Sequence, residues 1–183
     1  MKKNILLLGL LVLGICLIAG CKTKKEDDGA AAPAKSEESK VKTVSKNLNG
    51  ITVSAEYPKQ LWCTDMSSDT IRIYNVPTEK DISSGSPRIE ILVREDNKFD
   101  YFDMFKEHYE DIKSVPNKTI GGIDMEGRTY KYVGMEWTDY MGKVDEEHVV
   151  RITISINESS FVDIESGEGK AIIDSINFEK TAE

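Results

Sequence analysis

The chain has 183 residues, of which 39% are hydrophobic, and its 24 basic and 32 acidic residues give a net charge of −8. Residues 47–183 are more acidic still, with 15 bases against 27 acids, which excludes electrostatic attraction to nucleic acid or to an anionic membrane surface. We interpret this acidity as a source of solubility and mutual repulsion. Attraction to cations or to a basic partner is the alternative.

The first twenty residues have the pattern of a secretory signal peptide. Lys2 and Lys3 precede an apolar run from residue 5 to residue 18, and small residues precede Cys21. The segment 17–21 resembles the lipobox of bacterial lipoproteins, which implies cleavage between Gly20 and Cys21 and lipidation of the Cys21 thiol. The uncharged stretch 4–20 has 17 residues, at the lower limit for a spanning helix. A membrane-spanning helix and a plain secreted protein are the alternatives.

The predicted domain organisation follows from this leader. Residues 1–20 form the signal peptide, and residues 21–46 form a lipidated, disordered tether, because Lys, Glu, Ala and Ser dominate them and apolar residues are almost absent. Two or more acyl chains hold a protein stably on a membrane, whereas one binds only marginally. We therefore expect a lipid anchor on the extracytoplasmic side of the cell membrane. Residues 47–183 have the length of a single domain.

Within residues 47–183, alternation of apolar and polar side chains predicts strands with one buried face. The first carries Ile51, Val53, Ala55 and Tyr57 on one side and stops at Pro58. Gly121 and Gly122 predict a tight corner that needs positive φ. The predicted strands are residues 51–57, 69–76, 88–94, 123–133, 148–156 and 161–164, with a loop at 79–87 and a closing segment at 176–178.

Two segments have a helical pattern. The stronger one ends before Pro116, has Asn97 or Asp100 as its cap, and places four apolar residues on one face of a 3.6-residue period. These four residues are Phe102, Phe105, Tyr109 and Ile112. A second, shorter helix is expected at residues 169–175.

The order of these elements is similar to the PsbP-like family, named for an extrinsic lumenal protein of photosystem II. The resemblance is carried by Tyr57-Pro58 with Leu61-Trp62, by the strand 89–91, by the corner 120–122, by the strand 151–156 and by the closing segment 175–178. It implies an α+β fold, an α/β/α sandwich in which helices pack on the faces of a central, mainly antiparallel sheet. The family's fold includes a nuclear-import factor that binds the GTPase Ran, so the resemblance also implies partner-protein binding. The chain lacks the characteristic N-terminal region of the plant protein, and a photosynthetic role is not carried over.

Few residues suggest chemistry. Cys63 is the only thiol left after cleavage and lipidation, and nearby Asp65 disfavours a thiolate, so we expect a half-buried structural residue. His108 and His148 are 40 positions apart, which matches no zinc motif, and we expect both to be solvated beside acids. Asp103, Glu107 and Asp111 share one face of the predicted helix, which is the wet side of an amphipathic helix or a loose calcium site.

No nucleophile motif and no phosphate-binding loop is present, since Gly167-Glu168-Gly169 lacks the required spacing. Trp62, Trp137 and Tyr140 are candidates for a pocket, although aromatic residues in a domain of this size more often belong to its core. The sequence therefore predicts no catalytic, cofactor or metal site. The leading hypothesis is a non-enzymatic envelope lipoprotein that binds a partner protein. The alternative is a lipoprotein that binds a small ligand or a divalent cation with its acidic surface, and a hydrolase is a distant third.

Overall fold

The computed structural model describes residues 40–95, 106–156 and 165–181. Contacts divide the chain into a unit Met1–Glu37 and a unit Glu38–Glu183, and every described residue belongs to the second. The predicted signal peptide, the lipidation site at Cys21 and most of the tether therefore lie outside the described residues. None of the described helices is long and apolar enough to cross a membrane.

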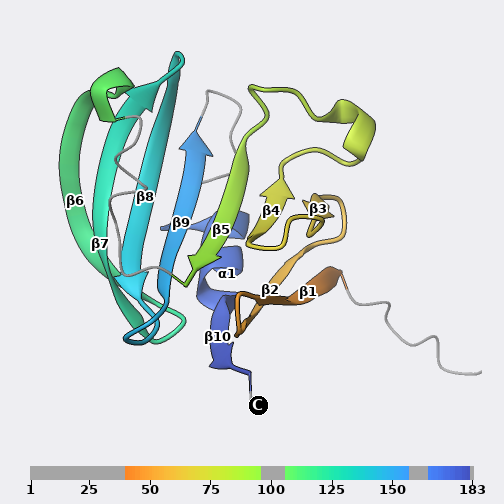
Figure 1. Cartoon of the computed structure of the whole chain (residues 1–183). Helices are drawn as coiled ribbons and strands as arrows, with labels where there is room; N and C mark the ends of the chain where they lie inside the picture. The colour runs from red at the N-terminus through yellow and green to blue at the C-terminus, as the bar shows by residue number, and fades with distance from the viewer. Residues whose placement is uncertain (1–39, 96–105, 157–164, 182–183) are drawn as a thin grey trace, which may run out of the picture. The chain divides into compact units, whose positions relative to one another are not determined.

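The described residues form two antiparallel sheets (Figure 1). A three-stranded sheet has the order β1-β2-β10, and a seven-stranded sheet has the order β3-β4-β5-β9-β8-β7-β6. The strands are β1 (Val41–Leu48), β2 (Ile51–Pro58), β3 (Trp62–Thr64), β4 (Thr70–Tyr74), β5 (Arg88–Arg94), β6 (Glu110–Ile120), β7 (Ile123–Tyr132), β8 (Met135–Lys143), β9 (Val149–Ile156) and β10 (Asn177–Lys180).

One face of the seven-stranded sheet holds the core. Ile89, Ile91 and Val93 of β5 are fully buried, which confirms the alternation predicted for residues 88–94. They belong to one hydrophobic cluster with buried residues of β2, β4, β9 and the helix α1 (Gly167–Ser175). The strands predicted at residues 51–57, 69–76, 123–133 and 148–156 are confirmed as β2, β4, β7 and β9.

The helix α1 confirms the prediction for residues 169–175 and packs against the three-stranded sheet. Its Ile172 and Ile173 are buried in the core cluster. The hydroxyl of Ser175 accepts a hydrogen bond from the backbone N–H of Glu56 at 2.8 Å, which attaches the end of the helix to β2. The three-stranded sheet and α1 therefore supply apolar side chains to the same core as the large sheet.

The predicted fold class is wrong. Of the described residues 59% lie in strands and 12% in helices, and α1 is their single α-helix. The protein is thus a β-rich fold, without the layers of helices that an α/β/α sandwich requires. The strand predicted at residues 161–164 lies outside the described residues.

The helix predicted around residues 102–112 is also wrong from residue 106 onward. Residues 96–105 lie outside the described part, but Lys106–His108 is a short 3-10 turn, and β6 begins at Glu110. Because β6 is an edge strand with mostly exposed side chains, its sequence has no strand-like alternation. The spacing of Tyr109 and Ile112 is typical of a helix, but pairing with β7 makes this segment a strand.

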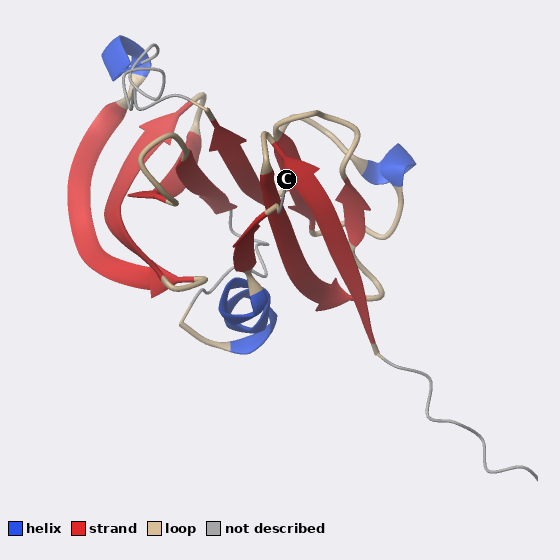
Figure 2. Cartoon of the chain, turned by 60° about the horizontal axis from the view of Figure 1, so that its bottom comes forward, coloured by secondary structure: helices blue, strands red, loops and turns tan. Residues whose placement is uncertain are grey.

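The edge position of β6 also explains Pro116, which was expected to follow a helix. Proline cannot donate a hydrogen bond to a neighbouring strand, so it is tolerated at edges and bulges. The β6–β7 pairing is irregular between Glu110 and Lys113 and again between Val115 and Lys118, around the proline. Figures 1 and 2 both show β6 strongly bent, as expected where bulges interrupt a ladder.

Two further boundaries differ from the predictions. β1 begins at Val41, inside the segment 21–46 that was predicted as tether, because β1 pairs with β2 along its whole length. β8 was not predicted as a strand. It pairs with β7 after a two-residue turn in which Val133 and Gly134 both have positive φ, and β-branched residues rarely adopt this conformation.

The corner at Gly121 and Gly122 is confirmed, with φ of +57° and +79°. The two residues form the turn between Ile120 and Ile123, which face each other in the β6–β7 hairpin. A Cβ atom at Gly121 would lie 2.6 Å from the ring of Phe178 on β10, whereas a Cβ at Gly122 would meet nothing within 4 Å. Of the two glycines, Gly121 is thus the one that lies against the three-stranded sheet.

This difference predicts unequal effects of two neighbouring substitutions. Gly122→Ala should lower the free energy of unfolding by about 1 kcal/mol, the usual penalty for a side chain at positive φ. Gly121→Ala should lower it by about 2–4 kcal/mol, because overpacking against Phe178 adds to that penalty. Urea unfolding followed by circular dichroism measures both, and equal effects would contradict the contact.

Candidate functional site

The face of the seven-stranded sheet opposite the core carries charged side chains in cross-strand register. Arg72 of β4 faces Glu90 of β5, which faces Thr153 of β9. Thr153 faces Asp139 of β8, and Asp139 faces Arg128 of β7. Residues that face each other across strands point to the same side of a sheet. A polar row therefore crosses five strands on the face away from the core.

A second row lies beside the first and adds aromatic rings. Tyr74 faces Arg88, Ser155 faces Trp137, and Trp137 faces Tyr130. The backbone N–H of Arg88 donates to the hydroxyl of Ser155 at 2.9 Å, which joins the two halves of the row. Because side chains on one face repeat every second residue, the two rows are about 7 Å apart along the strands.

All five arginines of the chain lie on this face. Arg72 and Arg128 belong to the polar row and Arg88 to the aromatic row, while Arg94 and Arg151 have the same alternation on β5 and β9. The lysines are the commoner cations of the sequence, so this concentration is specific to arginine. Arginine is the side chain best suited to hold carboxylates and phosphates by paired hydrogen bonds and to stack on rings.

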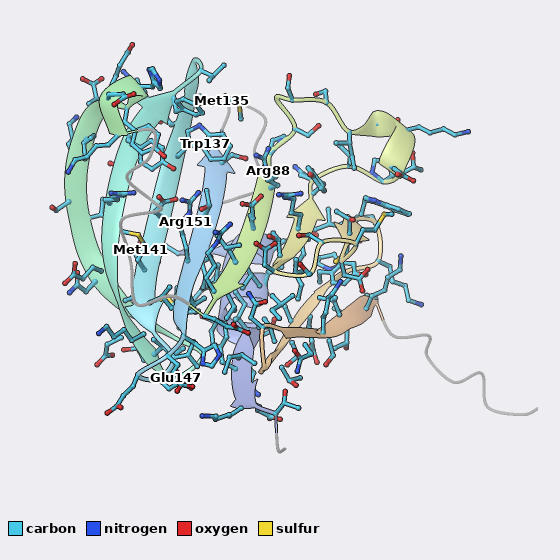
Figure 3. All side chains as sticks on the ribbon, viewed as in Figure 1. Arg88, Met135, Trp137, Met141, Glu147 and Arg151 are labelled. Atoms are coloured by element: carbon cyan, nitrogen blue, oxygen red, sulfur yellow. The ribbon has the colours of Figure 1, made fainter. Side chains whose placement is uncertain are left out.

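A cavity of about 680 Å³ opens on this face, which we name the arginine cavity. Four of its lining residues are the arginines Arg72, Arg88, Arg94 and Arg151, and two are the acids Asp69 and Glu90. Aromatic side chains complete the lining, namely Tyr109, Tyr130, Tyr132 and Trp137. Figure 3 shows Arg88 of β5 at the same end of the sheet as Met135 and Trp137 of β8, with Arg151 of β9 nearer the middle.

The carboxylate of Glu90 lies within ion-pair distance of two arginines. Its Oε2 atom lies 2.5 Å from Nε of Arg72 and 3.7 Å from Nε of Arg88, so the shorter contact belongs to Arg72. Although burial acts to lower the pKa of Arg72, the hydrogen bond and charge of Glu90 raise it. The buried Nε of Arg88 has no hydrogen-bond partner among the described residues. Arg88 is thus the less neutralised member of this pair.

Two aromatic rings flank Arg88. Its guanidinium carbon lies 4.9 Å from the centroid of Trp137 and 5.9 Å from that of Tyr74, within the range of cation–π attraction. The indole N–H of Trp137 donates to the backbone carbonyl of Tyr132 at 3.1 Å, which fixes the plane of the ring. Arg88 is therefore held in place although its Nε lacks a hydrogen bond.

A buried charge cluster lies at the other end of the polar row. The Asp139 side chain is fully buried and has ion pairs with Arg128 at 3.4 Å and with Arg151 at 3.8 Å. The Tyr130 hydroxyl donates to Asp139 at 3.2 Å, and burial followed by the Asp139 charge raises the Tyr130 pKa far above its usual value. Tyr130 is therefore a permanent donor, and Asp139 acts as the fixed counterion of two arginines.

Asp69 anchors the remaining arginine of the cavity. Burial acts to raise the Asp69 pKa, but hydrogen bonds from Ser67 at 2.6 Å and Thr70 at 2.9 Å, together with the charge of Arg94, lower it. The ion pair with Arg94 is 3.4 Å long. Every arginine that lines the cavity thus has a defined contact that limits its motion.

The arginines were not predicted as a group from the sequence, and only part of the aromatic lining was. Of the three aromatic residues singled out, Trp137 lines the cavity, Tyr140 is buried in the core, and Trp62 lies half-buried on β3. A signal was present: Arg72 stands between Ile71 and Ile73, and Arg151 between Val150 and Ile152. Such an arginine has its neighbours in the core and must project from the opposite face.

The histidines have different environments. His108 is exposed, as expected, with Glu107 at 3.7 Å. The prediction for His148 is wrong, because it is buried, and its Nδ1 lies 2.8 Å from Oδ1 of Asp145. Burial acts to raise the pKa of Asp145, but hydrogen bonds from the backbone N–H of Glu147 and from His148 lower it to about 2. This pair closes the β8–β9 turn, far along the strands from Arg88.

Cys63 and two of the three acidic residues named from the sequence lie in the described part of the chain. Cys63 is a half-buried free thiol, as predicted, and burial with the charge of Asp65 raises its pKa to about 11. Glu107 and Asp111 do not share a helical face, since Glu107 lies in the 3-10 turn and Asp111 in β6, where it pairs with Lys131. Asp103 lies outside the described residues. Within the described ranges, no group of three or more His, Cys, Asp or Glu side chains is placed to hold a metal ion.

The buried position of Asp139 predicts a large effect of Asp139→Asn. Loss of the carboxylate leaves Arg128 and Arg151 without their shared counterion, so the free energy of unfolding should fall by about 2–4 kcal/mol. Asp111→Asn removes an exposed ion pair and should leave stability nearly unchanged. Denaturant titration of both variants measures this, and an unaltered Asp139→Asn protein would refute the role of Asp139.

Comparisons with known proteins do not identify a family. No family model matches the chain, and no curated protein matches it. Among solved structures, the chain is similar to a protein of Bacteroides thetaiotaomicron VPI-5482, with 13% sequence identity and a TM-score of 0.40. The match covers 72% of this chain and 46% of that one, so the chain spans about half the length of its structural neighbour. The resemblance to the PsbP-like family stays a prediction, and the α+β architecture that it implied is wrong.

Proposed function

We propose that the chain is a lipid-anchored protein of the cell envelope whose folded domain binds a small organic anion in the arginine cavity. The observation that carries this proposal is the placement of all five arginines on one face of the sheet, in a domain that is otherwise strongly acidic. Four of them line one cavity together with rings and two carboxylates.

The dimensions and walls of the cavity support a small-molecule ligand. Its volume of about 680 Å³ falls in the range usual for ligand pockets, which combine apolar and aromatic walls with a few convergent polar groups. The arginines project from paired strands, and Arg72 and Arg94 are held by Glu90 and Asp69. A site built on such a scaffold loses little entropy when a ligand binds.

The other hypotheses have less support. Binding of a partner protein stays a prediction. The large apolar side chains that are exposed within the described ranges belong to four separate segments and include Met66 and Val133. The acidic surface proposed for a divalent cation depended on a helix at residues 102–112, of which the described residues form a turn and a strand. That the protein is not an enzyme also stays a prediction.

Thermal unfolding of the full chain in a non-ionic detergent tests the proposal. The probes are phenyl phosphate, benzoate, glycerol 3-phosphate and citrate at millimolar concentration. A ligand present at 100 times its Kd stabilises the folded state by about 2.7 kcal/mol, which raises Tm by roughly 5–10 °C for a domain of this size. We expect at least one organic anion to raise Tm and calcium chloride to have no effect.

The matched variants are Arg88→Gln, inside the cavity, and Lys42→Gln, which removes one positive charge from an exposed position of β1. Arg88→Gln should abolish the increase in Tm, and Lys42→Gln should retain it. The proposal fails if none of the four anions raises Tm, or if the increase survives in Arg88→Gln.

The lipid anchor is tested separately with Cys21→Ala. The diacylglycerol group is attached to the Cys21 thiol, so the variant should remain unprocessed and should not incorporate labelled palmitate. The wild-type protein should migrate as the shorter, labelled form. Normal processing and membrane fractionation of Cys21→Ala would contradict the proposed anchor.

A further inference from the structure

The arginine cavity is chemically divided between its two sides. On the side of β4 and β5, most of the lining is charged or hydroxylated and includes Asp69, Arg72 and Glu90, with Leu92 of β5 as the large apolar exception. On the side of β7 and β8, it is aromatic or apolar and consists of Tyr130, Tyr132, Val133, Met135 and Trp137. A ligand that contacts both sides must itself have a charged part and an apolar part.

Arg88 lies where the two sides meet. It is the arginine that contacts the Trp137 ring, at 4.9 Å, while its Nε lies 3.7 Å from the carboxylate of Glu90. Glu90 is closer to Arg72, and the buried Nε of Arg88 has no hydrogen-bond partner among the described residues. An anionic group that bridges Arg72 and Arg88 would therefore lie next to an aromatic ring.

The aromatic side is preorganised for a flat group. Trp137 is only half-buried, and its ring plane is fixed by the hydrogen bond to the carbonyl of Tyr132. Tyr109 stacks on Tyr130 with centroids 4.2 Å apart and meets Tyr132 edge-on at 5.5 Å. Rings held in this way favour a further ring over a flexible alkyl chain, because offset stacking and edge contacts add to the burial of apolar surface.

We infer that the ligand is an aromatic anion, with a planar ring against Trp137 and a phosphate, sulfate or carboxylate at Arg72 and Arg88. This inference rests on the proposed function, since it names the class of anion that the same cavity binds. The guanidinium carbon of Arg88 lies only 4.9 Å from the centroid of the Trp137 ring, so the acidic group and the ring of the ligand must be close together, as in a compound of one or two rings with the acidic group attached directly.

Isothermal titration calorimetry on the full chain in non-ionic detergent tests the inference with three probes. Phenyl phosphate carries both the ring and the anion, glycerol 3-phosphate carries the anion alone, and phenol carries the ring alone. Phenyl phosphate should bind at least tenfold more tightly than either of the other two. Arg88→Gln should weaken both phosphates by tenfold or more.

Trp137→Leu separates the ring from the anion. It should lower the affinity for phenyl phosphate by a much larger factor than the affinity for glycerol 3-phosphate, which loses only the support that the ring gives to Arg88. Trp137→Phe should restore most of the preference for phenyl phosphate. Trp62→Leu, at the other tryptophan, should leave every affinity unchanged, because Trp62 lies on β3 and does not line the cavity.

The outcomes distinguish the two proposals. Equal affinities for phenyl phosphate and glycerol 3-phosphate, both dependent on Arg88, would overturn the aromatic class and leave anion binding intact. A preference for phenyl phosphate that survives in Trp137→Leu would overturn the assigned position of the ring. If neither phosphate binds and the melting experiment is also negative for benzoate and citrate, anion binding itself fails, and the inference fails with it.

Discussion

The antiparallel register between β5 and β9 is the constraint on which the rest of the molecule depends. It pairs Ile89 with Ile154, Ile91 with Ile152 and Val93 with Val150, and all six side chains are fully buried. The same register places Glu90 opposite Thr153 and Leu92 opposite Arg151 on the other face. A slip of one residue would turn the isoleucines toward the cavity and the arginine into the core. Because successive side chains of a strand point to opposite faces, the register that buries the isoleucines also fixes the positions of the cavity residues.

The parts of the fold that could be predicted are those where one face is buried. The strands β2, β5 and β9 were predicted from their alternation of apolar and polar side chains. The corner at Gly121 and Gly122 was predicted from its need for positive φ. Where neither face of a strand is consistently buried, the apolar residues do not alternate, and the predicted element is wrong or absent. β6 is exposed and bulged at the sheet edge, so the spacing of Tyr109 and Ile112 suggested a helix. β8 begins after a turn with Val133 at positive φ, a residue that no turn rule selects.

The site was harder to predict than the fold because its parts are distant in sequence. Arg72 and Arg151 lie in strands that are separated only by β5 in the sheet order, but the sequence places most of the described domain between them. Composition also concealed the site. The net charge is a sum over the whole chain, in which acids outnumber bases. It therefore gives no indication that five arginines share one face of the sheet. The position of Arg72 between two isoleucines indicates that its side chain projects from the face opposite the core. Strand order is needed to show that the other arginines lie on the same face.

The acidity of the domain is compatible with anion binding because the exposed carboxylates and the arginines of the cavity act on a bound anion over different distances. At physiological ionic strength the Debye length is about 8 Å, so exposed carboxylates on other faces are largely screened at the cavity. Guanidinium groups that are mostly buried, such as those of Arg88 and Arg151, are screened less and act at contact distance. Replacing a buried ion pair by well-packed apolar side chains is often neutral or stabilising, so the ion pairs of Asp139 with Arg128 and Arg151 are weak evidence for a contribution to stability. What the buried carboxylate provides is position, since it keeps two arginines at fixed places on the sheet. The cavity is basic in an acidic protein because four arginines line it against two carboxylates.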